Sequence, residues 1–184
     1  MRTISQPSAI ARAIISDMAT LIADTQKALL HAFGHSFAMT HGRNGTVVES
    51  AKSEGDGATP LGTYPIRAAL IRTDRVHIRP MHLPWRAVHE SDGWSDDVRD
   101  AAYNRPVFHP HGFSAEHLWR DDAAYDIILI LGHNDSPPVR GAGSAIFFHC
   151  RNEKNYTEGC IAIARTDMEK ILPELRAGDL LEII

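Results

Sequence analysis

A histidine and a cysteine in the last third of the chain have the residue types and spacing of a nucleophilic pair. His149 ends an apolar run, and Cys160 closes the turn Thr157-Glu158-Gly159-Cys160 after a polar loop. A thiolate is the reactive form of cysteine, a nearby imidazole can generate it, and glycine lets the backbone approach a substrate carbonyl. The alternative is a small β-protein with buried cysteines and a structural histidine, because free cysteine is often a small buried hydrophobe.

The chain contains two cysteines, Cys150 and Cys160. Two cysteines exclude a disulfide framework and allow at most one bridge across a short loop. Such a bridge would consume the candidate nucleophile. A reactive thiol at Cys160 is therefore the favoured interpretation.

The bulk composition is that of an ordinary globular protein. The 184 residues predict one domain, with 43% hydrophobic and 23% charged residues. A net charge of -4 and a pI of about 6.2 give no electrostatic reason to bind nucleic acid or anionic lipid. No apolar run approaches the length of a membrane span.

The N-terminal segment differs from the rest of the chain in its sequence pattern. Residues 1–17 carry an early positive charge at Arg2, and Arg12 interrupts their apolar section. That section is too short for a convincing signal peptide. We predict a helical or disordered extension over residues 1–17 and a catalytic domain over residues 18–184.

The first half of this domain is predicted to be mainly strands. A helix over 18–32 is the competing interpretation, because Ala, Leu, Gln and Lys are good helix formers. The Asn44-Gly45 pair indicates a hairpin turn. The strands are expected over 19–24, 28–33, 36–40 and 64–70, with a Gly- and Thr-rich loop before the last of them.

The second half has clearer patterns. A continuous apolar run, 125–131, predicts a strand buried on both faces and ends at Gly132-His133. Strands are also expected over 144–148, 161–164 and 180–184. A helix is predicted over 165–172, with Thr166 or Asp167 as its cap. The fold class is therefore mainly β with a few short helices.

Residues 72–124 are long and irregular and contain most of the histidines. The segments 93–97 and 102–106 are predicted to be ordered loops pinned by aromatic residues. His109-Pro110-His111 supplies two possible metal ligands, but no Cys, Asp or Glu repeats at a ligand spacing. We expect no metal site here.

Two motifs together resemble the catalytic domain of the L,D-transpeptidases. That family carries a histidine on one strand and a Ser/Thr-His-Gly-Cys turn that holds the nucleophile. This chain has His149 and Thr157-Glu158-Gly159-Cys160 in the same order. Its segment 55–65, Gly-Asp-Gly-Ala-Thr-Pro-Leu-Gly-Thr-Tyr-Pro, is similar to the Thr-Pro-x-Gly-x-Tyr/Phe segment of the family.

The resemblance implies a single-domain, mixed β-sandwich and a cysteine acyltransferase without metal or organic cofactor. Cys160 would be the nucleophile and His149 its base, oriented by the Cys150 carbonyl. The backbone N–H groups of Gly159 and Cys160 would stabilise the oxyanion.

Three further residues are expected near the substrate. His133 ends the neighbouring buried strand, and a structural role is equally open for it. Thr157 and Glu158 belong to the turn of the nucleophile. Glu158 stands where the family usually has histidine, and Ala162 stands where Arg or Asn is common.

The implied substrate is a peptidoglycan stem tetrapeptide, cleaved with loss of its terminal D-alanine through a thioester. The family places such an enzyme in the periplasm or cell envelope, in cell-wall cross-linking or remodelling. We expect a monomer. The alternatives are an L,D-carboxypeptidase or amidohydrolase of the same fold, or a non-catalytic cell-wall or metal-binding β-domain.

Overall fold

The computed structural model describes residues 18–184, so the prediction for residues 1–17 lies outside the described part. Within residues 18–184, no helix is long and apolar enough to cross a membrane. The described chain is mostly strand, as predicted. Its helical elements are short: η1 (Glu49–Ala51), η2 (Ala123–Tyr125), α2 (Arg165–Ile171) and η3 (Leu172–Glu174).

Most strands join one mixed sheet. Its members are β1 (Thr20–Asp24), β2 (Leu29–Ala32), β3 (His35–Thr40), β4 (Thr46–Val48), β5 (Thr59–Ile71), β6 (Trp85–Ala87), β10 (Ile127–Leu131), β11 (Phe147–Cys150), β12 (Ile161–Ile163) and β13 (Leu180–Ile183). A smaller antiparallel sheet contains β7 (Asp92–Ser95), β8 (Pro106–Phe108) and β9 (Ala115–His117).

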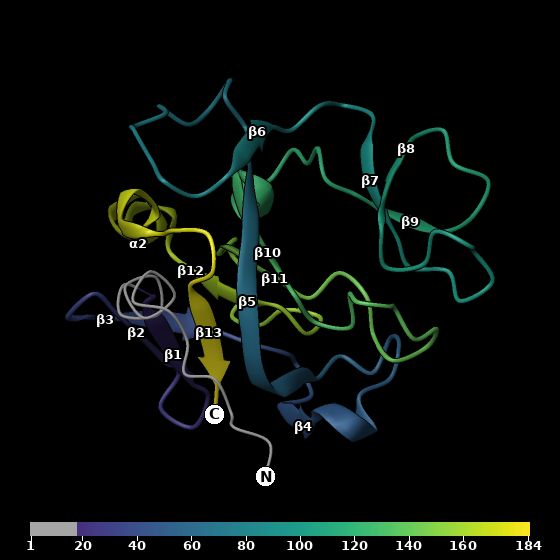
Figure 1. Ribbon diagram of the computed structural model, residues 1–184, viewed down its shortest axis with the longest axis horizontal. Helices are drawn as coiled ribbons and strands as arrows, with labels where there is room; N and C mark the ends of the chain where they lie inside the picture. The colour runs from purple at the N-terminus through teal and green to yellow at the C-terminus, as the bar shows by residue number, and fades with distance from the viewer. Residues whose placement is uncertain (1–17) are drawn as a thin grey trace, which may run out of the picture.

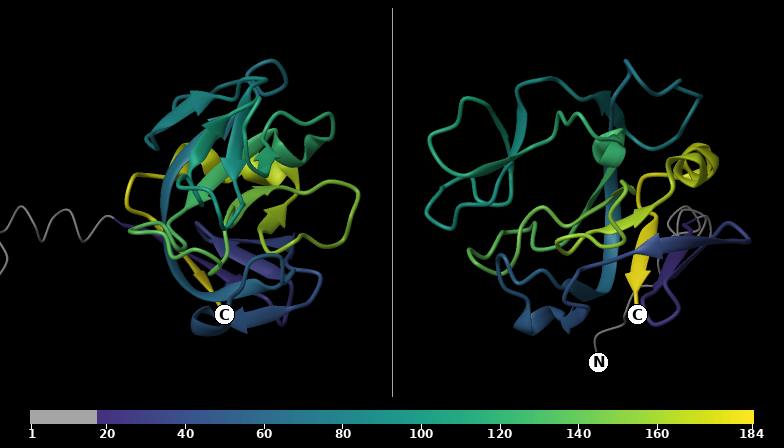
Figure 2. Two further views of the ribbon diagram at one scale, coloured as in Figure 1. Left: turned by 90° about the vertical axis from the view of Figure 1, so that its right-hand side faces the viewer. Right: turned by 180° about the vertical axis from the view of Figure 1, so that it is seen from behind.

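The long strand β5 closes the main sheet on itself. Its residues 62–65 pair with β13, and its residues 66–71 pair with β10. The remaining order runs from β10 through β11, β12, β3, β2 and β1 back to β13. Figure 1 shows β5 through the middle of the molecule, with β1–β3 and the small sheet on opposite sides of it. The right-hand view of Figure 2, from behind, shows the same separation.

The period-two alternation of the strands explains two hydrophobic clusters. Phe148 and Cys150 of β11 point into the main core together with Ile161 and Ile163 of β12. Phe147 points the other way, into a second cluster with Trp94 of the small sheet. The second cluster therefore joins the small sheet to the outer face of β11 and β12.

Three local predictions were wrong. Asn44-Gly45 does not form a hairpin, because β4 pairs in parallel with β5; the hairpin turn is Phe33-Gly34, both with positive φ, between β2 and β3. The segment 93–97 was expected to be a loop, but its first three residues belong to β7. The residue that caps α2 is Ala164, without a side-chain hydrogen bond.

The strand predictions of the first half are confirmed, although β5 begins at Thr59, inside the segment expected to be a loop. The helix over 18–32 is excluded by β1 and β2. The apolar run before Gly132 forms β10, which is buried on both faces except for a half-exposed Ile130. The strand before His149 is shorter than expected, since β11 begins at Phe147.

Candidate active site

Strand register brings His149 and Cys160 to the same face of the sheet. β11 and β12 run in parallel, with His149 beside Ala162 and Phe148 beside Ile161. Because side chains alternate, His149 and Ala162 face outward while Ile161 faces the main core. Cys160, one residue before Ile161, packs in the second cluster.

The two cysteines are therefore not equivalent. Both are free thiols. Cys150 is completely buried in the main core, whereas Cys160 lines the cavity on the outer face. This separation leaves Cys160 as the thiol that a substrate can reach.

His149 is held by two main-chain carbonyls. Its Nδ1 lies 2.8 Å from the Cys150 oxygen, the contact expected from the sequence, and 3.1 Å from the Ala124 oxygen. Because carbonyls only accept, Nδ1 carries the proton and Nε2 remains an acceptor. The ring of Tyr125 stands edge-on to the imidazole, with centroids 5.0 Å apart.

Burial keeps the histidine and the thiol uncharged. It lowers the pKa of His149 to about 4, against the two carbonyl hydrogen bonds that raise it. Burial also raises the pKa of Cys160 to about 12, and the charge of Glu116 adds to this effect. In the free protein the neutral pair is favoured over thiolate and imidazolium.

The thiol has two main-chain partners in this state. It donates to the Ala145 oxygen at 3.2 Å and accepts from the Phe147 N–H at 3.3 Å. Ala145 has a positive φ of 50°, so a strained residue presents this carbonyl. In the free protein, the Cys160 S–H is therefore hydrogen-bonded to the Ala145 carbonyl oxygen.

The turn of the nucleophile is fixed by two threonines. Thr157 Oγ1 donates to the Cys160 oxygen at 2.7 Å and accepts from the Gly159 N–H at 3.1 Å. Thr59, fully buried at the start of β5, donates to the Gly159 oxygen at 2.8 Å and accepts from the Gly42 N–H at 2.8 Å. Thr59 thus links the segment 55–65 directly to the turn.

Only glycine fits at position 159. Its φ is 140°, and a Cβ atom would lie 3.0 Å from the Ala58 oxygen. Its N–H, predicted as an oxyanion donor, is bonded to Thr157 in the free protein.

A cavity of about 410 Å³ opens over these groups. Its floor contains Cys160, His149, Thr40 and Ala162. Thr157 and Glu158, the residues expected to bind substrate, also line it. The Glu158 side chain is exposed and pairs with Arg43 at 3.2 Å.

His133 lies apart from the lining of this cavity. It is buried, its Nε2 lies 3.2 Å from the Ala142 oxygen, and its ring stands edge-on to Tyr64. Its Nδ1 is buried without a hydrogen-bond partner in the described part of the chain and lies 3.7 Å from a Glu49 carboxylate oxygen.

The histidines of the small sheet do not form a metal site. Across residues 18–184, no group of three His, Cys, Asp or Glu side chains is placed to hold a metal ion. His109 stacks on His117 with centroids 3.5 Å apart, and His111 lies 2.7 Å from Asp100.

Three further residues at the site were not predicted: Thr59, Tyr125 and Glu116. Thr59 lies within the motif at 55–65, so that motif could have pointed to it. Tyr125 hydrogen-bonds Glu116, which also lines the cavity. Nothing in the local sequence indicates this contact between β9 and η2.

Comparison with solved structures finds L,D-transpeptidases with low sequence identity. The protein from Xylanimonas cellulosilytica is 11% identical with a TM-score of 0.40, covering 91% of this chain and 61% of that one. The protein from Mycobacterium smegmatis is 12% identical with a TM-score of 0.40, covering 90% of this chain and 58% of that one. L,D-transpeptidase 1 from Mycobacterium tuberculosis is 10% identical with a TM-score of 0.38, covering 91% and 62%.

The chain thus spans less than two thirds of the length of these proteins. A search of curated proteins finds no match. The family comparison is decisive, because residues 17–183 match the model of the YkuD family, the L,D-transpeptidase catalytic domain. The chain therefore belongs to the YkuD family of L,D-transpeptidase catalytic domains.

Proposed function

We propose that this protein catalyses cysteine-dependent acyl transfer on peptidoglycan stem peptides. The observation that carries the proposal is the register of β11 and β12, which brings the imidazole of His149 and the thiol of Cys160 to one cavity. The family membership supports peptidoglycan as the substrate. It also supports a location in the periplasm or cell envelope.

In the first step, His149 Nε2 takes the proton of the Cys160 thiol as the sulfur attacks the carbonyl of the third stem residue. The thiol leaves the Ala145 oxygen for this transfer. The tetrahedral intermediate then collapses to a thioester. His149 returns the proton to the departing amine, and D-alanine leaves.

The oxyanion of the intermediate is stabilised by main-chain N–H groups of the turn, Gly159 and Cys160. The Gly159 N–H must leave Thr157 Oγ1 to contribute. The Thr59 hydroxyl holds the Gly159 carbonyl and so fixes the peptide plane that carries the Cys160 N–H.

A second substrate resolves the thioester. An amine from another stem peptide gives a cross-link, and water gives a carboxypeptidase reaction. The two outcomes differ in their products, an amide in the first case and a free tripeptide in the second.

The test uses a synthetic stem tetrapeptide with and without an added acceptor amine, and measures D-alanine release and products by mass spectrometry. We expect release by the wild-type protein and by Cys150→Ala, and none by Cys160→Ala. Release that persists in a folded Cys160→Ala protein would overturn the proposal. A new amide product in the presence of acceptor identifies transpeptidation, and the free tripeptide alone identifies hydrolysis.

A further inference from the structure

Asn104 is a buried polar residue that does not line the cavity. It lies in the loop between β7 and β8 and is 3% exposed. Its φ of 55° is in the left-handed region, which asparagine tolerates better than most residues. Its N–H donates to the Ser95 oxygen of β7 at 2.9 Å, which fixes the main chain at this point. A buried amide in such a place needs partners for its polar atoms.

The side-chain amide of Asn104 has four hydrogen-bond partners. Its Oδ1 accepts from the Trp94 Nε1–H at 2.8 Å and from the Ala145 N–H at 3.2 Å. Its Nδ2 donates to the main-chain oxygens of His133 at 3.1 Å and Asn134 at 2.7 Å. An amide has two acceptor sites and two N–H donors, so all of them are used. Because N–H groups only donate and carbonyls only accept, these partners also fix which way the amide points.

These contacts hold both ends of one loop. Residues 132–146 connect β10 to β11. Asn104 binds two carbonyl oxygens at the start of this loop and the Ala145 N–H near its end. The indole of Trp94 joins the same amide oxygen to the small sheet. The position of Asn104 therefore determines how the chain approaches β11.

The end of this loop provides both hydrogen-bond partners of the nucleophile. The Cys160 thiol donates to the Ala145 oxygen at 3.2 Å and accepts from the Phe147 N–H at 3.3 Å. Ala145 has a φ of 50°, a conformation that is unfavourable for a residue with a Cβ atom. Such a conformation persists only where the surrounding structure enforces it. The hydrogen bond from the Ala145 N–H to Asn104 is a constraint of this kind.

We propose that Asn104 is a positioning residue for the nucleophile. It holds Ala145 in the conformation that directs the Ala145 carbonyl at the Cys160 thiol, and so places the sulfur at the cavity that His149 also lines. The inference rests on the proposed function and adds to it a residue that acts through Ala145. Alignment of the attacking atom matters, because a displacement of about 1 Å can cost about a hundredfold in rate.

The kinetic test replaces the side chain without straining the main chain. Glycine adopts a positive φ freely, so Asn104→Gly removes only the amide. Because Asn104 does not line the cavity, we expect kcat for D-alanine release to fall about tenfold or more while KM stays unchanged. Asn104→Asp keeps an oxygen for the Ala145 N–H. Its buried carboxyl keeps its proton and donates it to a loop carbonyl, so this variant should recover most of kcat.

Trp94→Phe is the matched control. It removes the other hydrogen bond to Asn104 Oδ1 but keeps an aromatic ring against Phe147 and leaves the bond to Ala145 in place. Trp94→Phe should lose stability, because the lost hydrogen bond is buried. Its kcat and KM should stay close to the wild-type values.

The thiol itself gives a readout that does not depend on catalysis. In Cys150→Ala protein, Cys160 is the remaining cysteine, so the infrared S–H stretching band reports its hydrogen bond alone. A thiol that donates to a carbonyl absorbs at a lower frequency than a free thiol. We expect the low-frequency band in Cys150→Ala protein, with or without Trp94→Phe. Adding Asn104→Gly should shift the band to higher frequency.

An unshifted band or an unchanged kcat in folded Asn104→Gly protein would overturn the inference. Equal losses of kcat in Trp94→Phe and Asn104→Gly would also overturn it, because docking of the small sheet would then be the cause. If Asn104→Gly does not fold, Asn104→Ser replaces it, and a free-thiol band in Cys150→Ala protein alone would already contradict the inference. Absence of D-alanine release by wild-type protein would instead contradict the proposed function, and the band still tests the role of Asn104.

Discussion

Cys160 begins the reaction as a neutral thiol, which distinguishes this site from one with a preformed ion pair. Its proton is donated to the Ala145 oxygen, and His149 is neutral because burial disfavours its charged form. Substrate binding must therefore supply part of the free energy that ionises the pair.

The raised thiol pKa predicts a particular pH dependence. With a pKa of about 12, the thiolate fraction grows tenfold per pH unit throughout the range below it. We expect iodoacetamide alkylation of Cys160, followed by mass spectrometry in Cys150→Ala protein, to rise continuously from about pH 7 to about pH 10. A plateau beginning near or below about pH 8 would indicate a preformed thiolate–imidazolium pair instead.

Cys160 and His149 could be chosen as candidates from sequence because their segments carry a glycine turn and a buried strand. The partners that set their pKa values could not. Glu116, whose charge adds to the effect of burial on the pKa of Cys160, reaches the site from β9, and Ala124, whose carbonyl contacts His149, reaches it from η2; no local pattern predicts that these segments meet.

At the scale of elements, the turn of the nucleophile depends on β5. The Thr59 hydroxyl hydrogen-bonds to both the Gly159 oxygen and the Gly42 N–H. Within the turn, the Thr157 hydroxyl donates to the Cys160 oxygen. The segment 55–65 and the turn at 157–160 are therefore one structural unit, although about a hundred residues separate them.

Thr59→Val tests this unit. The change preserves shape but leaves a buried N–H and a buried carbonyl without their partner, which should cost about 1–3 kcal/mol of unfolding free energy. We expect D-alanine release to fall by about tenfold or more as the turn loosens. Urea unfolding and the release assay measure the two effects.

Thr63→Val is the matched control, because Thr63 lies on the same strand with an exposed side chain. It should change neither quantity appreciably. If Thr59→Val behaves like Thr63→Val in both assays, β5 does not hold the turn.

Apolar runs predicted most strands correctly, because strands that bury their side chains in the core carry a recognisable pattern of apolar residues. Errors arose where the local residue types favour one structure and the folded chain adopts another. Asn44-Gly45 has the chemistry of a hairpin, but β4 pairs with β5. Thr166 and Asp167 have the chemistry of a cap, but both lie inside α2, whose cap position is Ala164.

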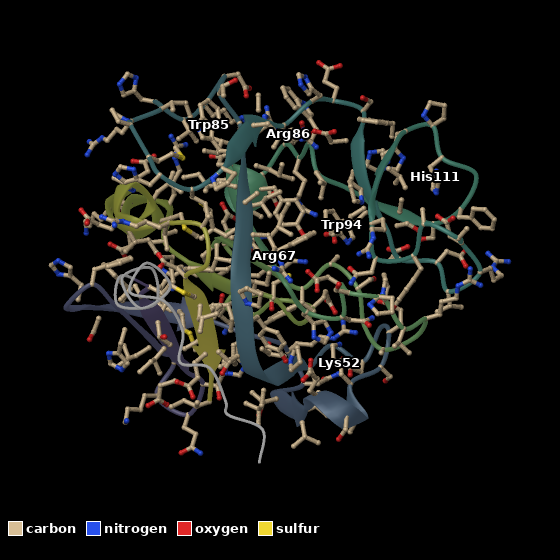
Figure 3. The ribbon with its side chains drawn as sticks, in the orientation of Figure 1. Lys52, Arg67, Trp85, Arg86, Trp94 and His111 are labelled. Atoms are coloured by element: carbon tan, nitrogen blue, oxygen red, sulfur yellow. The ribbon has the colours of Figure 1, made fainter. Side chains whose placement is uncertain are left out.

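At the scale of the molecule, the small sheet packs on the second hydrophobic cluster and contributes Glu116 to the lining of the cavity. Trp94 anchors it: the ring stands edge-on to Phe147 at 5.1 Å, and its Nε1 donates to the Asn104 side chain at 2.8 Å. Figure 3 shows Trp94 between the small sheet and the main sheet, and Trp85 at the far end of β5. The packing of the small sheet on the main sheet depends on contacts between residues far apart in the sequence. The hydrophobic pattern of residues 72–124 therefore did not predict it.

Trp94→Ala should therefore cost about 3–5 kcal/mol of unfolding free energy, since a buried indole and its hydrogen bond are lost. The half-exposed Trp85 provides the control, and Trp85→Ala should cost less than about 1 kcal/mol. Denaturant unfolding of both proteins makes the comparison. Similar losses for the two would contradict the anchoring role of Trp94.

The central claim is that Cys160 is the nucleophile of an acyltransferase, and the most direct measurement is intact-protein mass after incubation with a carbapenem. A strained β-lactam carbonyl presents the same electrophile as the stem peptide. The account predicts one covalent adduct per chain, mapped to Cys160, present in Cys150→Ala and absent in Cys160→Ala. No adduct on folded wild-type protein, or an adduct on Cys150, would contradict it.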